Sequence, residues 1–582
     1  MLDLAITGGT LVDGTGTAAR RADVGVREGR VAEVAPPGGL REPAGASLDA
    51  SECIVTPGFV DVHTHYDGQA TWDALMAPSS WHGVTTVVMG NCGVGFAPAR
   101  RDRHAWLIEL MEGVEDIPGT ALSAGIRWEW ESFPEYVAAL EALPRTLDVA
   151  AQVPHGAVRA YVMGERGTGE AGASAEDLAR MGAIVREGVA AGALAFSTNR
   201  LPMHTSRSGV PVPGTFAPHA ELLALCEAVR AAGGGLVQAV PAGSMGEDRD
   251  APLREVELYR RLSLETGRAI TFTLAQVHAN PDQWRRLLER VEAANAAGAR
   301  LVPQVQGRPG GLLASWDTFN PFMARPSCRA LADLPLDVRV AQLREPGVRA
   351  AILAEGSHDG PAMAIMRHSL HSAFPMQDGP VFEPEPELSI AGRAKREGRE
   401  PEAVLYDALC EQVESSPSGR SRMLHVYFTG YANGSLGDLH AMLMHPDTVM
   451  GLSDGGAHCS MLCDASLPTF ALVHWVRDRS RGPRIPLERM VAMLSRDTAE
   501  LYGLRDRGRV APGLRADLNV IDLARLRLEV PEIASDLPTG ARRVVQRAAG
   551  YAAPLCAGEL TFRDGRETGA RPGRVVRGAR SA

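Results

Sequence analysis

The chain has 582 residues and a formal net charge of -10, and 45% of its residues are hydrophobic. This composition is ordinary for a globular enzyme and excludes a largely disordered chain. Because there is no basic stripe, it also argues against a nucleic-acid partner. The sequence contains no apolar stretch of about 18 residues, and its first residues lack the basic and apolar regions of a signal peptide. We therefore expect a cytoplasmic protein with a small-molecule substrate and no membrane partner. The possibility of a homo-oligomer stays open.

Short β-type runs separated by glycine and proline turns fill residues 1–57, a pattern typical of a small antiparallel sheet. A similar pattern returns near the end of the chain, through "GRVAPGLRADLNVIDL" and "CAGELTFRDGRET". We infer that residues 1–57 and 501–568 pair into one β-sandwich domain. The residues after 568 are basic, and we expect them to be frayed.

Between these segments, residues 58–500 alternate apolar strand-length runs with amphipathic helical stretches. Helices are expected at residues 174–191, after a Ser174-x-x-Asp177 capping signal, and at 281–297. Because continuously apolar strands that alternate with helices indicate a parallel sheet covered on both faces, we predict a (β/α)8 barrel. Nine runs compete for eight strands. One of "RLVPQVQ", "MLHVYF" and "TVMGLSD" is therefore surplus or belongs to an insertion.

The region from about residue 307 to 420 is rich in proline, glycine and arginine and is too long for a simple loop inside a compact domain. Its helical pieces, such as "PGVRAAILAE", predict an inserted subdomain. An insertion after the seventh strand would lie over the C-terminal face of the barrel, where the chemistry of such barrels takes place.

Candidate ligands follow three of the predicted strands. In "VDVHTHYD", His63 and His65 share one face of a strand end, a pair that suits a divalent metal. Cys92 follows "VTTVVMG" in a glycine-rich turn, and Asp454 ends "TVMGLSD". The eight cysteines have no regular spacing, which indicates reduced thiols. Because the strands of a barrel end on one face, we expect these side chains to converge.

The chain resembles the amidohydrolase superfamily, and within it the D-aminoacylase or N-acyl-D-amino-acid deacylase group. The resemblance rests on "PGFVDVHTH", "HGVTTVVMGNCGVGFAP", "PHGAVRAYVMG", "GALAFST", "LSDGGAH" and "DTAELYGLRDRGRVAPGLRADLNVID". It implies hydrolysis of an amide at a metal centre, with ligand or catalytic positions at His63, His65, Cys92 and Asp454. A bound zinc ion lowers the pKa of its water to about 7, and a nearby carboxylate must move the proton. The resemblance therefore implies Asp454 as the proton shuttle, and the four ligands with a thiolate favour one zinc ion per chain.

The sequence also departs from the family pattern, which places metal histidines on the fifth and sixth strands. Gln238 and Gln276 stand in the corresponding runs. His278 is a candidate to replace a missing metal ligand, and the alternative is that it is a solvent-facing loop histidine. Lys395, the only lysine, lies in a polar stretch, which argues against a carboxylated lysine that bridges two metals.

Substrate-binding residues are predicted from their positions after strands. An acylated amino acid carries a carboxylate, which Arg200 or Arg308 could bind through a guanidinium fork. His155 and His458 are candidates to orient the substrate or the catalytic carboxylate, although ordinary structural histidines are equally consistent with the sequence.

The leading prediction is therefore hydrolysis of N-acyl-D-amino acids or related small acylated compounds. The alternatives are a hydrolase of the same superfamily that opens a cyclic amide, imide or lactone, and a non-catalytic homologue.

Overall fold

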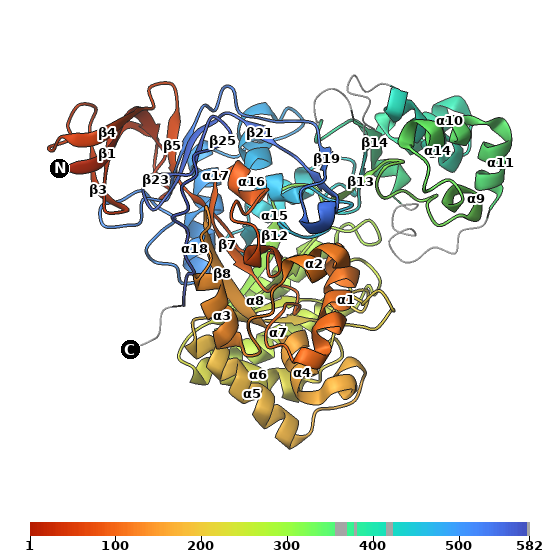
Figure 1. Cartoon of the computed structure of the whole chain (residues 1–582), viewed down its shortest axis with the longest axis horizontal. Coiled ribbons are helices and arrows are strands. Elements are labelled where there is room, and N and C mark those ends of the chain that lie inside the picture. The colour runs from red at the N-terminus through yellow and green to blue at the C-terminus, as the bar shows by residue number, and fades with distance from the viewer. Residues whose placement is uncertain (356–368, 377–380, 415–422, 579–582) are drawn as a thin grey trace.

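A computed structural model of the chain describes residues 1–355, 369–376, 381–414 and 423–578 (Figure 1). Its centre is a parallel sheet whose neighbours follow the chain order from the first strand to the last. The sheet closes between its two ends through a parallel bridge from Thr64 to Gly455. The predicted (β/α)8 barrel is confirmed. Its strands are β6 (Phe59–Asp61), β7 (Val84–Met89), β8 (Asp148–Pro154), β9 (Ala195–Asn199), β10 (Leu236–Val240), β11 (Ile270–Leu274), β12 (Leu301–Gln306) and β16 (Val449–Gly451).

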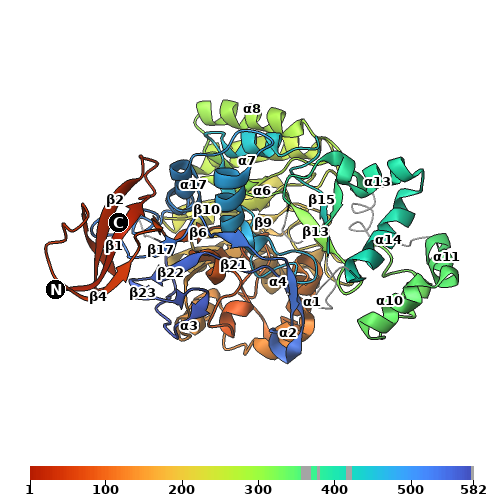
Figure 2. The same ribbon diagram turned by 90° about the horizontal axis from the view of Figure 1, so that it is seen from above.

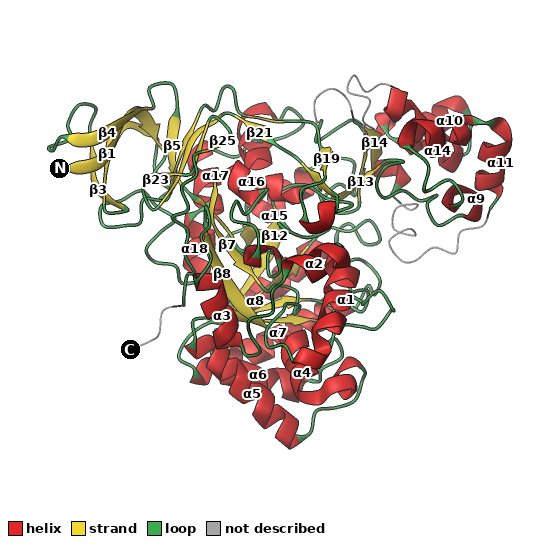
Figure 3. Cartoon of the chain, viewed as in Figure 1, coloured by secondary structure: helices red, strands yellow, loops and turns green. Residues whose placement is uncertain are grey.

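Helices surround the barrel strands (Figures 2 and 3). The two helices predicted with boundaries are present as α5 (Ala175–Ala190) and α8 (Gln283–Ala296). The capping signal forms as expected, because Asp177 N donates to Ser174 Oγ and Ser174 N donates to Asp177 Oδ2. The others in this region are α1 (His104–Glu115), α2 (Gly119–Gly125), α3 (Phe133–Glu141), α4 (His155–Met163), α6 (His219–Ala231), α7 (Ala251–Thr266), α15 (Gly437–Leu443), α16 (Leu467–Phe470), the π-helix Ala471–Asp478, α17 (Leu487–Leu494) and α18 (Arg496–Leu501).

The two ends of the chain meet in one eight-stranded sheet beside the barrel (Figure 2). A strand from the C-terminal part, β17 (Leu518–Ile521), pairs antiparallel with β5 (Ile54–Pro57) on one side and with β22 (Tyr551–Cys556) on the other. Aliphatic side chains from both ends fill its core, among them Val24, Val55, Val520 and Leu555. The remaining strands are β1 (Leu2–Leu11), β2 (Arg20–Arg27), β3 (Arg30–Ala35), β4 (Ala44–Asp49) and β23 (Glu559–Leu560).

An inserted subdomain separates the seventh barrel strand, β12, from the eighth, β16, and extends away from the terminal sheet (Figure 1). It contains a three-stranded sheet of β13 (Gly311–Ala314), β15 (Leu424–Tyr427) and β14 (Ala373–Pro375). The surplus run "MLHVYF" is therefore β15, the central strand of this small sheet. Trp316, Phe322 and Tyr406 pack in a separate hydrophobic core. Its helices are α9 (Pro326–Arg329), α10 (Leu336–Arg344), α11 (Pro346–Ala354), α13 (Ile390–Glu397) and α14 (Pro401–Glu414).

The C-terminal tail was expected to be frayed, and up to residue 578 this prediction is wrong. Strand β8 pairs with β9 only from Gln152 onward. On that side, the backbone groups of its first residues are therefore left without a partner from β9. The tail occupies this position: Val149 N donates to Arg574 O, and Val576 N donates to Val149 O. The backbone N–H of Arg574 also donates to the buried carboxylate of Asp148. The tail docks because it completes this edge of the barrel.

Candidate metal centre

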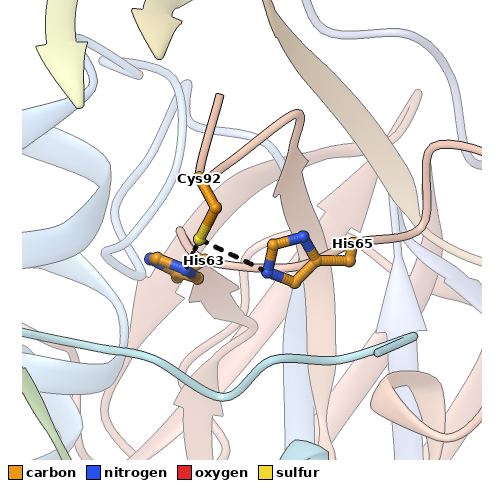
Figure 4. Close-up of side chains that lie close together, drawn as sticks. All are labelled: His63, His65 and Cys92. Atoms are coloured by element: carbon orange, nitrogen blue, oxygen red, sulfur yellow. Dashed lines mark hydrogen bonds between the residues drawn. The ribbon is translucent and has the colours of Figure 1, made fainter. Parts of the chain in front are cut away.

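His63, His65 and Cys92 gather at the C-terminal ends of the first two barrel strands (Figure 4). The Cys92 Sγ atom lies 3.4 Å from His63 Nε2 and 3.9 Å from His65 Nε2. Oδ1 of Asp454, which follows the last strand, lies 3.5 Å from His63 Nε2 and 3.7 Å from His65 Nε2. The structure therefore brings together the four residues that the sequence predicted as ligands.

His63, His65 and Cys92 form one group whose ligand atoms all lie within 4.8 Å of one another, and Asp454 adjoins this group through the two histidines. The separations of 3.4 Å and 3.5 Å from His63 Nε2 to Cys92 Sγ and Asp454 Oδ1 are those expected around a zinc ion. Zinc binds histidine nitrogen and carboxylate oxygen at about 2.0–2.2 Å and thiolate sulfur at about 2.3 Å, which places tetrahedral ligand atoms about 3.3–3.7 Å apart. The donor set of two imidazoles, a thiol and a carboxylate also favours zinc over magnesium or manganese. The residues present are thus suited to hold a zinc ion.

The second nitrogen of each histidine faces an acceptor, which fixes the ring for coordination through Nε2. His63 Nδ1 lies 2.8 Å from Gln304 Oε1, at the seventh strand. His65 Nδ1 lies 3.4 Å from Oε1 of Glu115, the last residue of α1. In the tautomer that carries its proton on Nδ1, toward these acceptors, the lone pair on Nε2 points to the shared space.

The electrostatics of the cluster favour a cation within it. Burial would lower the pKa of His65, but the carboxylates of Glu115 and Asp454 outweigh it and raise that pKa well above its usual value. Burial would likewise raise the pKa of Asp454, yet His65 and His63 hold it below its usual range. Burial lowers the pKa of His63 to about 4, which keeps that ring neutral. Burial raises the pKa of the Cys92 thiol to about 12, so this group ionises only beside a compensating positive charge.

The cluster lines a cavity of about 310 Å³ at the C-terminal face of the barrel. Leu312, Phe428 and Thr429 bring the base of the inserted subdomain into its wall, and Gln306 contributes from the end of β12. Apolar side chains make up much of the remaining surface, including Leu201, Met203, Met245, Met461 and Leu462. The cavity can therefore bury an apolar part of a small molecule beside the ligand cluster.

The two arginines predicted to bind a substrate carboxylate already hold carboxylates of the protein. Arg200 lies 3.1 Å from Glu255 Oε2 and donates to two backbone carbonyls. Arg308 is fully buried, with Nε 3.2 Å from Oδ1 of Asp464, and Asp464 rather than Arg308 lines the cavity. The lining contains neither guanidinium.

The two predicted substrate-orienting histidines lie in different places. His155 is buried at the start of α4, where Nε2 lies 3.0 Å from Glu221 Oε1 and Nδ1 lies 2.9 Å from Thr198 Oγ1. His458 lines the cavity, and its Nε2 lies 3.7 Å from Glu115 Oε2. The structure therefore places His458, and not His155, next to the cluster.

The glutamines and the histidine discussed for the fifth and sixth strands have other contacts. Gln238 Oε1 accepts from Cys92 N at 3.0 Å, so this side chain supports the turn that carries Cys92. Gln276 donates to Asp438 at 2.6 Å. His278 Nε2 faces the backbone carbonyl of Tyr427, and its Nδ1 lies 2.8 Å from His371 Nε2. In the described structure His278 is a contact to the inserted subdomain and is not among the residues that line the cavity.

Sequence reasoning missed three polar residues of the site: Glu115, Gln304 and His204. His204 lines the cavity, and burial lowers its pKa to about 3. It follows β9 by a few residues, a position that could have raised it as a candidate. Gln304 and Gln306 stand two positions apart on β12 and therefore lie on the same face of a barrel strand. This pair of polar residues could have indicated the site. Glu115 ends a helix, and no motif pointed to it.

Comparison with known proteins finds relatives of the whole chain and of parts of it. An uncharacterised protein of Mycobacterium tuberculosis is 28% identical, over 97% of this chain and 92% of its own length. A D-aminoacylase of Alcaligenes xylosoxydans xylosoxydans is 32% identical over 50% of this chain and 55% of its own length. The solved structure of N-acyl-D-glutamate deacylase from Bordetella bronchiseptica, complexed with zinc and a phosphonate inhibitor, has a TM-score of 0.65 at 24% identity and 99% coverage of both chains. The last similarity shows the shared fold.

A parallel barrel with histidine, cysteine and aspartate side chains at the ends of its first, second and last strands has the architecture and the donor groups of a metal-dependent barrel enzyme. The chain belongs to the Amidohydrolase family, whose sequence model matches residues 47–568. The resemblance stated from the sequence is confirmed. The protein is a hydrolase that acts on carbon–nitrogen bonds other than peptide bonds, with a small molecule as its substrate.

Proposed function

We propose that the protein hydrolyses the amide bond of N-acyl-D-amino acids or related small acylated compounds, with one zinc ion held by His63, His65, Cys92 and Asp454. The observation that carries this proposal is the group formed by the ligand atoms of His63, His65 and Cys92 in the wall of the cavity, with Asp454 Oδ1 within 3.7 Å of both histidine Nε2 atoms. The 32% identity to a D-aminoacylase supports the acylated substrate class.

The bound zinc supplies Lewis-acid polarisation of the scissile carbonyl and lowers the pKa of a water molecule. Proton transfer and substrate positioning are the work of residues of the chain. The Asp454 carboxylate is held ionised by the two histidines, so it can accept the proton of the attacking water and deliver it to the departing amine. The apolar wall, including Met203 and Phe428, receives the acyl group and excludes water from it. His458 orients the substrate from the cavity wall.

The direct test uses protein purified without chelator. Elemental analysis should find about one equivalent of zinc, and a screen of N-acyl D- and L-amino acids should find release of the free amine that stops on metal removal and returns with zinc. Two tightly held equivalents would contradict the single-metal proposal. An amidase activity that survives complete metal removal would contradict the metal-dependent one.

A second candidate is ring opening of a cyclic amide, imide or lactone. It is favoured by the engagement of Arg200 and Arg308 with Glu255 and Asp464, because a cyclic substrate has no carboxylate that needs a free guanidinium. The same screen should therefore include cyclic amides and imides. Hydrolysis of these and of no N-acyl amino acid would select this candidate. The assignments of Arg200, Arg308 and His155 to substrate binding stay predictions, and a rise in KM on conservative substitution would test each of them.

A further inference from the structure

One buried carboxylate serves two histidines of the site. The Glu115 side chain is only 2% exposed, with Oε1 3.4 Å from His65 Nδ1 and Oε2 3.7 Å from His458 Nε2. Glu115 Oε1 and His65 Nδ1 are both buried and neither has a hydrogen-bond partner in the described structure, so their 3.4 Å approach is an ion-pair contact. Burial of a carboxylate without a partner is strongly unfavourable. The contacts with the two imidazoles therefore explain why this carboxylate is buried here.

The backbone around Glu115 fixes its place relative to the metal ligands. The carbonyl of Glu115 accepts from His458 N, and the carbonyl of Asp116 accepts from Cys459 N at 3.1 Å. Asp116 Oδ2 also accepts from Ser460, from N at 2.8 Å and from Oγ at 2.6 Å. The end of α1 thus holds the loop that follows Asp454, and the backbone of Glu115 is fixed relative to that loop.

We propose that Glu115 is a positioning residue of the metal centre, which holds the Nδ1–H of His65 and the ring of His458 through one carboxylate. This inference rests on the proposed function, because it assigns a role toward the zinc ligand His65. Glu115 lines the same cavity, and its side-chain contacts there are with the two histidines. It keeps the proton on Nδ1, leaves the Nε2 lone pair available, and increases the electron donation of the ring, as carboxylates behind histidine ligands do.

The test compares metal-free Glu115→Gln with wild type and with Glu112→Gln. Glu112 lies one turn earlier on α1, where it pairs with Arg207 at the surface, so the control removes the same charge from the same helix. The zinc dissociation constant is measured by competition with a chromophoric chelator, and the visible spectrum is recorded with Co²⁺ in place of zinc. We expect Glu115→Gln to weaken zinc binding about 10- to 100-fold and to change the Co²⁺ spectrum, while Glu112→Gln changes neither.

A purely structural role would lower the thermal stability of the metal-free protein without a matching change in the Co²⁺ spectrum. Glu115→Asp keeps the charge and should recover part of the lost zinc affinity, and it also serves if Glu115→Gln does not fold. A zinc dissociation constant within about twofold of wild type in both variants would overturn the inference while leaving the proposed function intact. Failure of the wild-type protein to bind zinc would overturn both.

Discussion

Three residues at the metal centre have positive φ angles, which L-residues adopt at a cost of about 1–3 kcal/mol each. The values are 56° for Cys92, 49° for Asp454 and 51° for His458. Each is held by a backbone hydrogen bond: Cys92 N donates to Gln238, Asp454 N to His63 O, and His458 N to Glu115 O. The strained backbone is maintained by its neighbours, and it turns these side chains toward one another.

Asp454→Asn should separate metal binding from proton transfer. The amide keeps the size of the side chain and one coordinating oxygen, but it has no basic group at neutral pH. We expect folding and most of the zinc to be retained, and turnover to fall by about 10²-fold or more. Zinc content, thermal unfolding and turnover measured on the same preparation decide the matter. Turnover close to that of wild type would exclude Asp454 as the shuttle, and joint loss of zinc and activity would make it chiefly a ligand.

Cys92→Ser should weaken zinc retention, because a neutral hydroxyl replaces the thiolate that zinc favours. The matched control is Cys226→Ser on α6, which removes a buried thiol far along the chain from the ligands. We expect the control to keep its zinc content through dialysis against a weak chelator while Cys92→Ser loses most of it. Equal zinc retention in the two variants would make Cys92 a structural cysteine.

The sequence predicted which side chains gather at the ends of the barrel strands better than it predicted contacts between distant elements. His63, Cys92 and Asp454 each follow an apolar run that can be recognised as a strand. Because the ends of parallel barrel strands lie on one face, the proximity of these side chains could be inferred. Arg200 and Arg308 also follow strands, but nothing local indicates that Glu255 or Asp464 neutralises them from another element. Pairings of this kind depend on how elements pack, which a single sequence does not encode in its spacing.

At the scale of elements, the lack of information about packing in a single sequence also explains why nine runs were found for eight barrel strands. The run "MLHVYF" has the composition of a barrel strand, yet it lies in the middle of the three-stranded sheet of the inserted subdomain as β15. Both positions bury an apolar strand on its faces, so burial alone cannot distinguish them. The helices at 174–191 and 281–297 were predictable because their amphipathic period, and for the first its capping box, are local signals.

The docked tail gives a prediction at this scale. Deletion of residues 571–582 should remove the strand-like contact with Val149 and the burial of Val576, and lower the free energy of unfolding by about 2 kcal/mol or more. Urea denaturation followed by tryptophan fluorescence measures the change. Deletion of residues 579–582 alone is the control and should have no effect. A tail that contributes nothing to stability would give the same midpoint for both truncations.

At the scale of the whole molecule, an ion pair connects the part of the inserted subdomain between β14 and α13 to the barrel. Glu383 accepts from Arg479 Nε at 3.0 Å and from the backbone N–H of Leu436 at 2.7 Å, and both charged side chains are buried. Burial would raise the pKa of Glu383, but hydrogen bonds from His474, Arg479 and Leu436 outweigh it and lower the pKa to about 2. The carboxylate form is therefore the one that stabilises the folded chain.

This shift predicts how stability depends on pH. Because the pKa is lower in the folded state, the contribution of Glu383 is fully present above about pH 4.5 and is lost as the pH falls toward 2; its size is about 3 kcal/mol. The difference in unfolding free energy between wild type and Glu383→Gln should be largest at neutral pH and shrink between pH 4.5 and 2. Denaturant titrations across this range measure it. A difference that is independent of pH would show that the ionised carboxylate is not the stabilising form.

The candidate metal centre lies across the seam where the barrel closes, and this has a consequence for the order of biosynthesis. Asp61 on β6 and Ser453 after β16 are hydrogen-bonded neighbours although 392 residues separate them in the chain. The ribosome releases His63, His65 and Cys92 long before it makes Asp454, so a nascent chain carries an incomplete ligand set until its last barrel strand is finished. Zinc bound to the completed set would fasten the first strand to the last and slow opening of the seam. The backbone amide of His65, which donates to Gly455 O, should then exchange its hydrogen more slowly in the zinc-loaded protein than in the metal-free one.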